Sequence, residues 1–157
     1  TEGAACTALL AKQVIDNEEE LIIANADQWI DWSPSHFINF VHKKKMDGVI
    51  LTFNSTHPKH SFCRINDEGL ITEVAEKKPI SNLATVGIYY FKRGSDFVKS
   101  SEQMISKDIR TNNEFYICPV YNELIEGGSI IYPYPVVEMR GLGTPEELER
   151  FIGSLDK

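Results

Sequence analysis

The sequence predicts an α/β domain built on a mostly parallel sheet, because helical and strand patterns alternate in its first third. Residues 3–16 are rich in Ala and Leu and precede the apolar run 21–25. A second helical pattern opens at Ser33 and precedes the apolar run 48–53. A helix followed by a buried strand, twice in succession, is typical of the repeating unit of such sheets.

The first helix is predicted over residues 3–16, since Ala and Leu favour helices and the apolar residues recur on one face. That face carries Ala5, Leu9, Leu10 and Val14. The run at 21–25 is short and continuously apolar up to Asn25, which predicts a strand covered on both faces.

The second helix begins with a clear start signal, Ser33 as N-cap and Pro34 at the first helical position. Its apolar stripe consists of Phe37, Ile38 and Val41. The following run at 48–53 predicts another buried strand.

The middle of the chain predicts antiparallel structure. Residues 61–65 and 70–75 flank Asn-Asp-Glu-Gly at 66–69, which is typical of a hairpin turn. A further strand is expected over 85–91, where Gly87 indicates close approach by a backbone or a ligand. A helix is expected over 95–105.

The last third is less uniform. Residues 115–126 are ambiguous, because their aromatic spacing suits a helix while Pro119 interrupts its start. Residues 130–139 predict a pair of short extended pieces. Thr144 followed by Pro145 and, at the third helical position, Glu147 predicts a capped helix start.

Composition limits the classes of function. A chain of 157 residues with 42% hydrophobic and 25% charged residues is one ordinary globular domain. Its net charge of −7 and pI near 5.1 argue against nucleic acid and anionic membranes as partners. A small phosphorylated ligand held by one or two basic side chains stays compatible. The three cysteines are far apart and form no C-x-x-C pair, which predicts reduced thiols and a cytoplasmic location.

Asp27 follows the predicted strand 21–25 and is the first candidate for chemistry. In α/β sheets, ligands bind outside the carboxyl ends of the parallel strands. A carboxylate there suits Mg²⁺, which takes one or two protein carboxylates together with substrate phosphates. The alternative is a turn, in which Asp27 caps the backbone of Gln28 and Trp29.

Glu76 and Lys77, at the end of a predicted hairpin strand, form a second candidate. A glutamate can accept from sugar hydroxyls and a lysine can donate to a phosphate. A solvated run of charges is the commoner explanation of such a motif in isolation. Gly3 opens a helix among small residues, where backbone N–H groups can approach an anion or a nucleobase, although a plain helix start is commoner.

Six segments in a fixed order resemble the nucleotidylyltransferase superfamily that makes nucleotide-activated sugars. The segments are residues 2–11, 22–28, 60–78, 84–91, 113–128 and 141–151. More closely, the chain is similar to small bacterial members found with capsule and lipopolysaccharide biosynthesis. The resemblance implies a Rossmann-like mixed, mostly parallel sheet flanked by helices, of the nucleotide-diphospho-sugar transferase type. It implies transfer of a nucleoside monophosphate from an NTP to a phosphorylated acceptor, for which a sugar 1-phosphate is the expected class.

The resemblance also implies site residues. Gly3 and Ala4 match the nucleotide-binding helix start, and Asp27 matches an aspartate that binds Mg²⁺ and the nucleotide phosphates. Glu76 matches the residue that grips the sugar ring, and Lys77 the catalytic lysine on the sugar phosphate. The acceptor pocket would further include Ser61, Thr85 and Gly87. Ser61 follows His60 where many members carry Tyr-Gly, so acceptor recognition is expected to differ.

Two departures from the family pattern are visible. The glycine-rich G-x-G-x-R loop that cradles the triphosphate does not occur, so residues 1–157 are expected to be the C-terminal portion of a domain, truncated before its first strand–loop–helix unit. Gly141 stands where many members carry a second metal-binding Asp, which leaves Glu138 as a candidate substitute.

Three other functions stay open. Asn25-Ala26-Asp27 could serve a metal-dependent glycosyltransferase as a D-x-D-like motif, although Asn25 replaces its first aspartate. The acceptor could be a non-sugar phosphate used by a cytidylyltransferase. Without its triphosphate loop, the chain could instead be an inactive binding or assembly domain, with a second copy of itself as a candidate partner.

Overall fold

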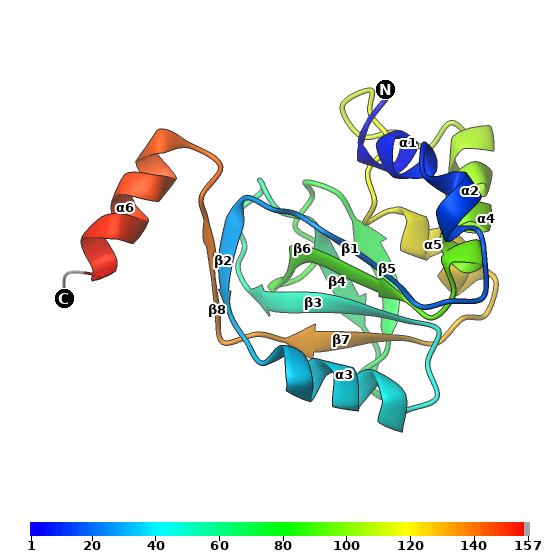
Figure 1. The fold of residues 1–157 in the computed structure, drawn as a ribbon, viewed down its shortest axis with the longest axis horizontal. Helices are drawn as coiled ribbons and strands as arrows, with labels where there is room; N and C mark the ends of the chain where they lie inside the picture. The colour runs from blue at the N-terminus through cyan, green and yellow to red at the C-terminus, as the bar shows by residue number, and fades with distance from the viewer. Residues whose placement is uncertain (156–157) are drawn as a thin grey trace.

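The computed structural model describes residues 1–155 and places a six-stranded sheet at the centre of the chain (Figure 1). Its strand order is β5-β4-β6-β3-β7, and β1 pairs with β6 beside that path. The strands are β1 (Leu21–Ala24), β3 (Gly48–Asn54), β4 (Phe62–Ile65), β5 (Ile71–Ala75), β6 (Leu83–Phe91) and β7 (Ile131–Pro135). A two-stranded ribbon joins β2 (Gln28–Asp31) to β8 (Glu138–Gly141).

The α/β class, with a mixed sheet flanked by helices, is confirmed, but the prediction of mostly parallel pairing was wrong. Among residues 1–155 only β3 and β7 pair in parallel, and the other pairs are antiparallel. The strands β1, β3 and β7 do run in one direction, as the helix–strand alternation predicts. The later strand β6 lies between β1 and β3 and runs against both, which makes each of those pairs antiparallel.

Strand β1 is half-exposed, so the prediction that residues 21–25 are covered on both faces was also wrong. Its burial alternates along the strand, and Ile22 is 46% exposed. β1 pairs with β6 alone and lies at the edge of the sheet. In contrast, β3 is buried over its first five residues, as its continuous apolar run predicts.

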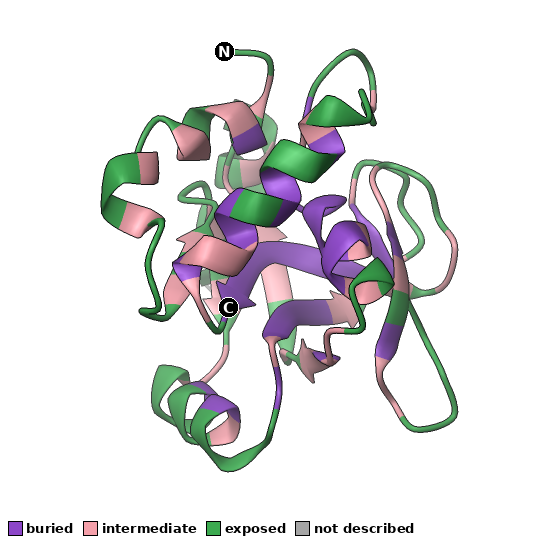
Figure 2. Ribbon diagram, turned by 90° about the vertical axis from the view of Figure 1, so that its right-hand side faces the viewer, coloured by how far each residue is buried: buried purple, intermediate pink, exposed green. Residues whose placement is uncertain are grey.

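Helices cover the two faces of the sheet, and a core cluster lies beneath each layer (Figures 1 and 2). α3 (Pro34–Lys43) packs on one face through Phe37 and Val41. The other face carries α4 (Gly94–Ser106) and α5 (Val120–Glu126), with Phe97 and Tyr121 in its core. The short α1 and α2 pack beside α4.

The predicted helix over 3–16 is divided into α1 (Ala4–Leu9) and α2 (Lys12–Ile15). The backbone leaves helical geometry at Ala11, so the segment after the break no longer continues the face that begins at Ala5. Ala5 is buried, but Leu10 is 77% and Val14 74% exposed. The predicted four-residue apolar face was therefore wrong beyond Leu9.

The local start and turn signals are confirmed. The Ser33 hydroxyl accepts from the His36 N–H at the start of α3, and the β4–β5 hairpin closes on a turn in which Gly69 has φ 77°. α6 (Pro145–Leu155) begins with the Glu147 N–H donating to the Thr144 hydroxyl at 3.2 Å. The ambiguous segment is a loop that ends in turns up to Pro119, and it is helical in α5.

The β2–β8 ribbon and α6 project from one end of the main sheet (Figure 1). The ribbon pairs Gln28 with Gly141, which brings the end of β1 next to the segment 141–143. No helix within residues 1–155 is long and apolar enough to cross a membrane.

Candidate active site

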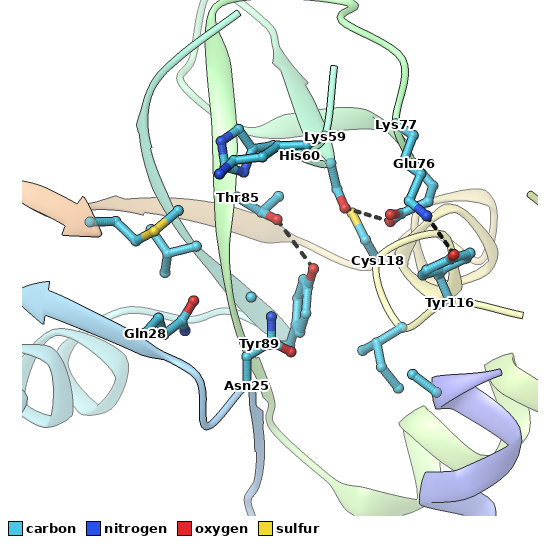
Figure 3. Close-up of a pocket in the computed structure, with 16 residues that line it drawn as sticks. Asn25, Gln28, Lys59, His60, Glu76, Lys77, Thr85, Tyr89, Tyr116 and Cys118 are labelled. Atoms are coloured by element: carbon cyan, nitrogen blue, oxygen red, sulfur yellow. Dashed lines mark hydrogen bonds between the residues drawn. The ribbon is translucent and has the colours of Figure 1, made fainter. Parts of the chain in front are cut away.

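A cavity of about 310 Å³ opens where β1 and β5 end, against the first half of β6 (Figure 3). Segments distant in sequence meet there, namely the start of α1, the β1–β2 turn, the loop that leads into β4, the end of β5, and the loop before α5. The predicted residues that line it are Ala4, Ser61, Glu76, Lys77, Thr85 and Gly87. Gly3 and Asp27 are not part of the lining.

Glu76 contributes a partly buried carboxylate to the cavity wall. The Ser61 hydroxyl donates to Glu76 Oε2 at 2.5 Å. Burial raises the pKa of Glu76, while the hydrogen bond from Ser61 and the charge of Lys77 partly lower it. A carboxylate with a second oxygen in a cavity can accept hydrogen bonds from ligand hydroxyls.

Lys77 follows Glu76 and holds an unusual backbone conformation, with φ 53° in the left-handed region. Its ammonium donates to the Tyr116 hydroxyl at 2.6 Å and lies 4.6 Å from the centre of that ring. The hydrogen bond to Tyr116 is the main cause that raises the pKa of Lys77. Sequence reasoning missed Tyr116, and its only signal was an aromatic residue in the ambiguous segment 115–126.

Thr85 and Tyr89 form the polar part of the β6 wall. Their hydroxyl oxygens lie 3.2 Å apart, and both residues are buried. Burial raises the pKa of Tyr89 well above its ordinary value, so the phenol keeps its proton at neutral pH. Gly87 lies between them, where its missing side chain leaves room for Asn25. A close approach at Gly87 is present, but the approaching group is the Asn25 side chain and not the predicted backbone or ligand.

The neighbouring basic side chains differ in charge state. Burial, followed by the charges of Lys59 and His57, lowers the pKa of His60 to about 4. His60 is therefore neutral at pH 7 and edge-on to the Phe53 ring, with the ring centres 5.1 Å apart. Lys59 is bound to Glu147 at 2.6 Å.

Asp27 is exposed just outside the cavity, between the lining residues Asn25 and Gln28. Its carbonyl accepts from the Leu142 N–H at 2.8 Å. A Cβ atom on Gly143 would lie 2.6 Å from Asp27 Oδ2, so the carboxylate occupies space that any side chain at 143 would fill. An exposed carboxylate of this kind fits Mg²⁺, which typically takes one or two protein carboxylates together with water and substrate phosphates. Within residues 1–155 no three His, Cys, Asp or Glu side chains gather into a metal site.

Gly141, at the position of the expected second carboxylate, is covered by Glu147. A Cβ atom on Gly141 would lie 2.8 Å from both carboxylate oxygens of Glu147. Glu138, the substitute suggested by the sequence, lies opposite Asp31 at the other end of the ribbon and binds Arg140 at 2.8 Å. The Glu147 carboxylate therefore occupies the space that a side chain at position 141 would fill.

Gly3 packs against the loop that carries Tyr116. A Cβ atom on Gly3 would lie 2.5 Å from the Phe115 carbonyl oxygen, and Gly3 has φ 122°. The Phe115 N–H donates to the Glu2 carbonyl at 2.8 Å, and the Ala5 N–H donates to the Phe115 carbonyl at 3.0 Å. This glycine thus permits close packing, while its neighbour Ala4 lines the cavity.

The cavity thus brings the Glu76 carboxylate and the Lys77 ammonium together at one end of a mixed α/β sheet flanked by helices, the class of fold to which this chain belongs. Comparison with known families identifies the particular one. The sequence profile of the nucleotidyl transferase family matches residues 1–122, and the chain belongs to that family. No curated protein sequence matched the chain.

Solved structures agree with this assignment. The nucleoside-diphosphate-sugar pyrophosphorylase from Vibrio cholerae RC9 superposes with a TM-score of 0.81 at 27% identity, over 98% of this chain and 66% of that one. A UDP-glucose pyrophosphorylase in complex with UDP-glucose gives 0.76 at 18% identity, over 98% and 62%. The inositol-1-phosphate CTP transferase from T. maritima gives 0.71 at 12% identity, over 98% and 61%. The last two show the fold alone, and the chain spans 61 to 66% of the length of these three chains.

Proposed function

We propose that this domain transfers a nucleoside monophosphate from an NTP to a phosphorylated acceptor of the sugar 1-phosphate class, with release of pyrophosphate. The observation that carries the proposal is the pairing of Glu76 with Lys77 at one cavity. The carboxylate suits the hydroxyl groups of an acceptor, and the ammonium next to it suits the phosphate. Family membership and the Vibrio cholerae structure support the same chemistry.

In the proposed reaction, an oxygen of the acceptor phosphate attacks the α-phosphorus of the NTP. The bond between the α-phosphorus and the bridging oxygen breaks, and pyrophosphate leaves with that electron pair. Lys77 holds the acceptor phosphate and offsets its charge, and Glu76 orients the rest of the acceptor. No general base is required, because a phosphate dianion is already a nucleophile.

Asp27 is the residue that would hold Mg²⁺. When bound, the ion neutralises the negative charge of the nucleotide phosphates. Gly3 and Ala4 at the start of α1 are proposed to face the nucleotide, since Ala4 lines the same cavity as Glu76. We place the reaction in nucleotide-sugar synthesis for surface polysaccharides, in a reducing cytoplasm that keeps the three cysteines as free thiols.

Pyrophosphate release by the 157-residue chain, mixed with an NTP, Mg²⁺ and a panel of phosphorylated acceptors, tests the proposal. Asp27→Ala should abolish turnover, and Asp31→Ala should not, because Asp31 is also exposed but lies opposite Glu138, at the other end of the ribbon from the cavity-lining Gln28. Turnover that survives Asp27→Ala contradicts the metal assignment.

Calorimetric titration with NTP and Mg²⁺ decides whether the chain binds nucleotide at all. An absence of binding identifies an inactive binding or assembly domain. Release of a nucleoside diphosphate from a nucleotide sugar, without pyrophosphate, identifies a glycosyltransferase. Acceptor preference within the panel separates sugar phosphates from non-sugar phosphates.

A further inference from the structure

The hydroxyl group of Tyr116 lies at the same end of the cavity as the Lys77 ammonium (Figure 3). It accepts a hydrogen bond from Lys77 Nζ at 2.6 Å. Within residues 1–155 the Tyr116 O–H donates to no protein acceptor, so its own proton is available to a ligand. Two donors of different charge are thus held within one hydrogen-bond length of each other.

The two residues are held on defined backbones, and the hydrogen bond between Lys77 and Tyr116 joins their donor groups. Lys77 adopts φ 53°, a left-handed conformation that is unfavourable for a lysine and persists where the surrounding structure imposes it. On the other side, Phe115 precedes Tyr116 and is hydrogen-bonded through its backbone N–H and C=O to Glu2 and Ala5. The two donor groups are therefore already together before a ligand arrives, which lowers the entropic cost of binding.

The surrounding charges explain why a second donor is useful. Glu76 lies next to Lys77 in sequence, and Glu114 is close enough to raise the pKa of Lys77. These carboxylates offset the positive charge that Lys77 presents to an anion. A neutral hydroxyl adds a hydrogen bond with a defined direction, whereas a lysine alone acts as a point charge.

We propose that Tyr116 and Lys77 together form the phosphate-binding end of the acceptor site, each donating a hydrogen bond to one phosphate group. The assignment of that phosphate to the acceptor rests on the proposed function. Tyr116 is thereby a ligand-contacting residue as well as the residue that positions Lys77. The expected ligand is a phosphate monoester. The ring of Tyr116 limits the space for the group that is esterified to this phosphate.

Tyr116→Phe is the decisive variant, since it removes the hydroxyl and keeps the ring. Tyr132→Phe is the matched control, because Lys44 lies 4.3 Å from the centre of the Tyr132 ring and neither residue lines the cavity. Binding of inorganic phosphate and of a hexose 1-phosphate is measured by calorimetry at low salt, without nucleotide. We expect roughly ten-fold weaker binding in Tyr116→Phe, the typical loss of a hydrogen bond to a charged group, and no change in Tyr132→Phe.

Two further readouts separate ligand contact from a structural role. The pKa of Lys77, followed by ¹³C NMR of its side chain, should fall in Tyr116→Phe and stay constant in Tyr132→Phe. In turnover assays, Tyr116→Phe should raise KM for the acceptor and leave KM for the NTP unchanged. Unchanged or tighter phosphate binding in Tyr116→Phe overturns the inference. Tyr116 would then only accept the hydrogen bond from Lys77 and would not contact the phosphate.

The proposed function and this inference can fail separately. If the wild-type chain binds phosphate more tightly than Tyr116→Phe but releases no pyrophosphate with any acceptor, the two-donor site stands and the proposed function falls. If the wild type turns over and Tyr116→Phe binds and reacts identically, the inference falls alone.

Discussion

The side chain of Asn25 occupies the space left by the missing side chain of Gly87. A Cβ atom on Gly87 would lie 2.7 Å from Asn25 Cγ, a separation that real Cβ atoms essentially never show. The Asn25 N–H also donates to the Gly87 carbonyl at 2.9 Å. These contacts attach the end of β1, and with it Asp27, to the β6 wall of the cavity.

Gly87→Ala should lower the free energy of unfolding by somewhat more than about 1–2 kcal/mol, because its left-handed backbone is strained and the Asn25 side chain must also move away from the new Cβ. Gly69→Ala is the control, since Gly69 has nearly the same φ, 77° against 76°, and nothing within 4 Å of its added Cβ. It should cost only the backbone term, about 1–2 kcal/mol. Urea denaturation measures both values.

The double variant Asn25→Ala/Gly87→Ala separates the clash from the strain. Truncating Asn25 removes the amide that the new Cβ would meet. The double variant should therefore regain the stability lost to this clash and keep only the backbone cost seen in Gly69→Ala. Equal losses in Gly87→Ala and Gly69→Ala would show that the Asn25 contact is not tight.

Gly87 also illustrates what the sequence could predict. A glycine inside an apolar strand indicates close approach, but the approaching residue lies 62 positions earlier in the chain. Local signals were sufficient for the caps at Ser33 and Thr144 and for the β4–β5 hairpin, because each depends on residues a few positions apart. Their physical cause is contained in the segment itself.

Long-range pairing was not predictable in this way. The insertion of β6 between β1 and β3 makes a parallel pattern antiparallel, and no residue of β1 carries a signal of it. The same holds for Tyr116 and Lys77, which are 39 residues apart and meet only because the loop before α5 packs against Glu2 and Ala5. Glu76 and Lys77 could be proposed from their residue types, whereas their partners required the fold.

Gly143→Ala should weaken binding of a divalent cation without altering the fold. The added methyl group would lie 2.6 Å from Asp27 Oδ2 and displace the carboxylate. We expect the Mg²⁺ concentration for half-maximal turnover to rise roughly ten-fold, the effect of disturbing one ligand. Binding of Mn²⁺ followed by electron paramagnetic resonance checks this without turnover. Gly153→Ala, with nothing within 4 Å, is the control and should leave cation binding unchanged.

Lys77→Gly should stabilise the domain relative to Lys78→Gly and still abolish function. Both variants gain the same freedom in the unfolded chain, but only Lys77 has a left-handed backbone that glycine relieves. The Lys77 variant should therefore be the more stable by about 1–2 kcal/mol. Its turnover should fall by about 10²-fold or more, since the charge on the acceptor phosphate is no longer offset. Equal stability of the two variants would show that φ at Lys77 carries no strain.

The pKa of His60 predicts a loss of stability in mild acid. Burial and the charges of Lys59 and His57 lower this pKa from 6.5 to about 4, so the folded state binds a proton less readily than the unfolded chain. The stability due to neutral His60 is complete above pH 6.5 and declines as pH falls toward 4. Glu76 acts in the opposite direction, because its raised pKa gives stability that is present at low pH and lost as the carboxyl ionises.

Comparing variants isolates the histidine from the glutamate. Wild type and His60→Gln should be denatured with urea at a series of values between pH 4 and pH 7, and their difference in free energy plotted against pH. The wild type should lose more stability than His60→Gln over this range, on the order of 1 kcal/mol for a side chain that remains partly exposed. His36→Gln changes an exposed histidine on α3 and should follow the wild type throughout. Parallel curves for wild type and His60→Gln would mean that His60 is protonated in the folded protein as easily as in the unfolded chain.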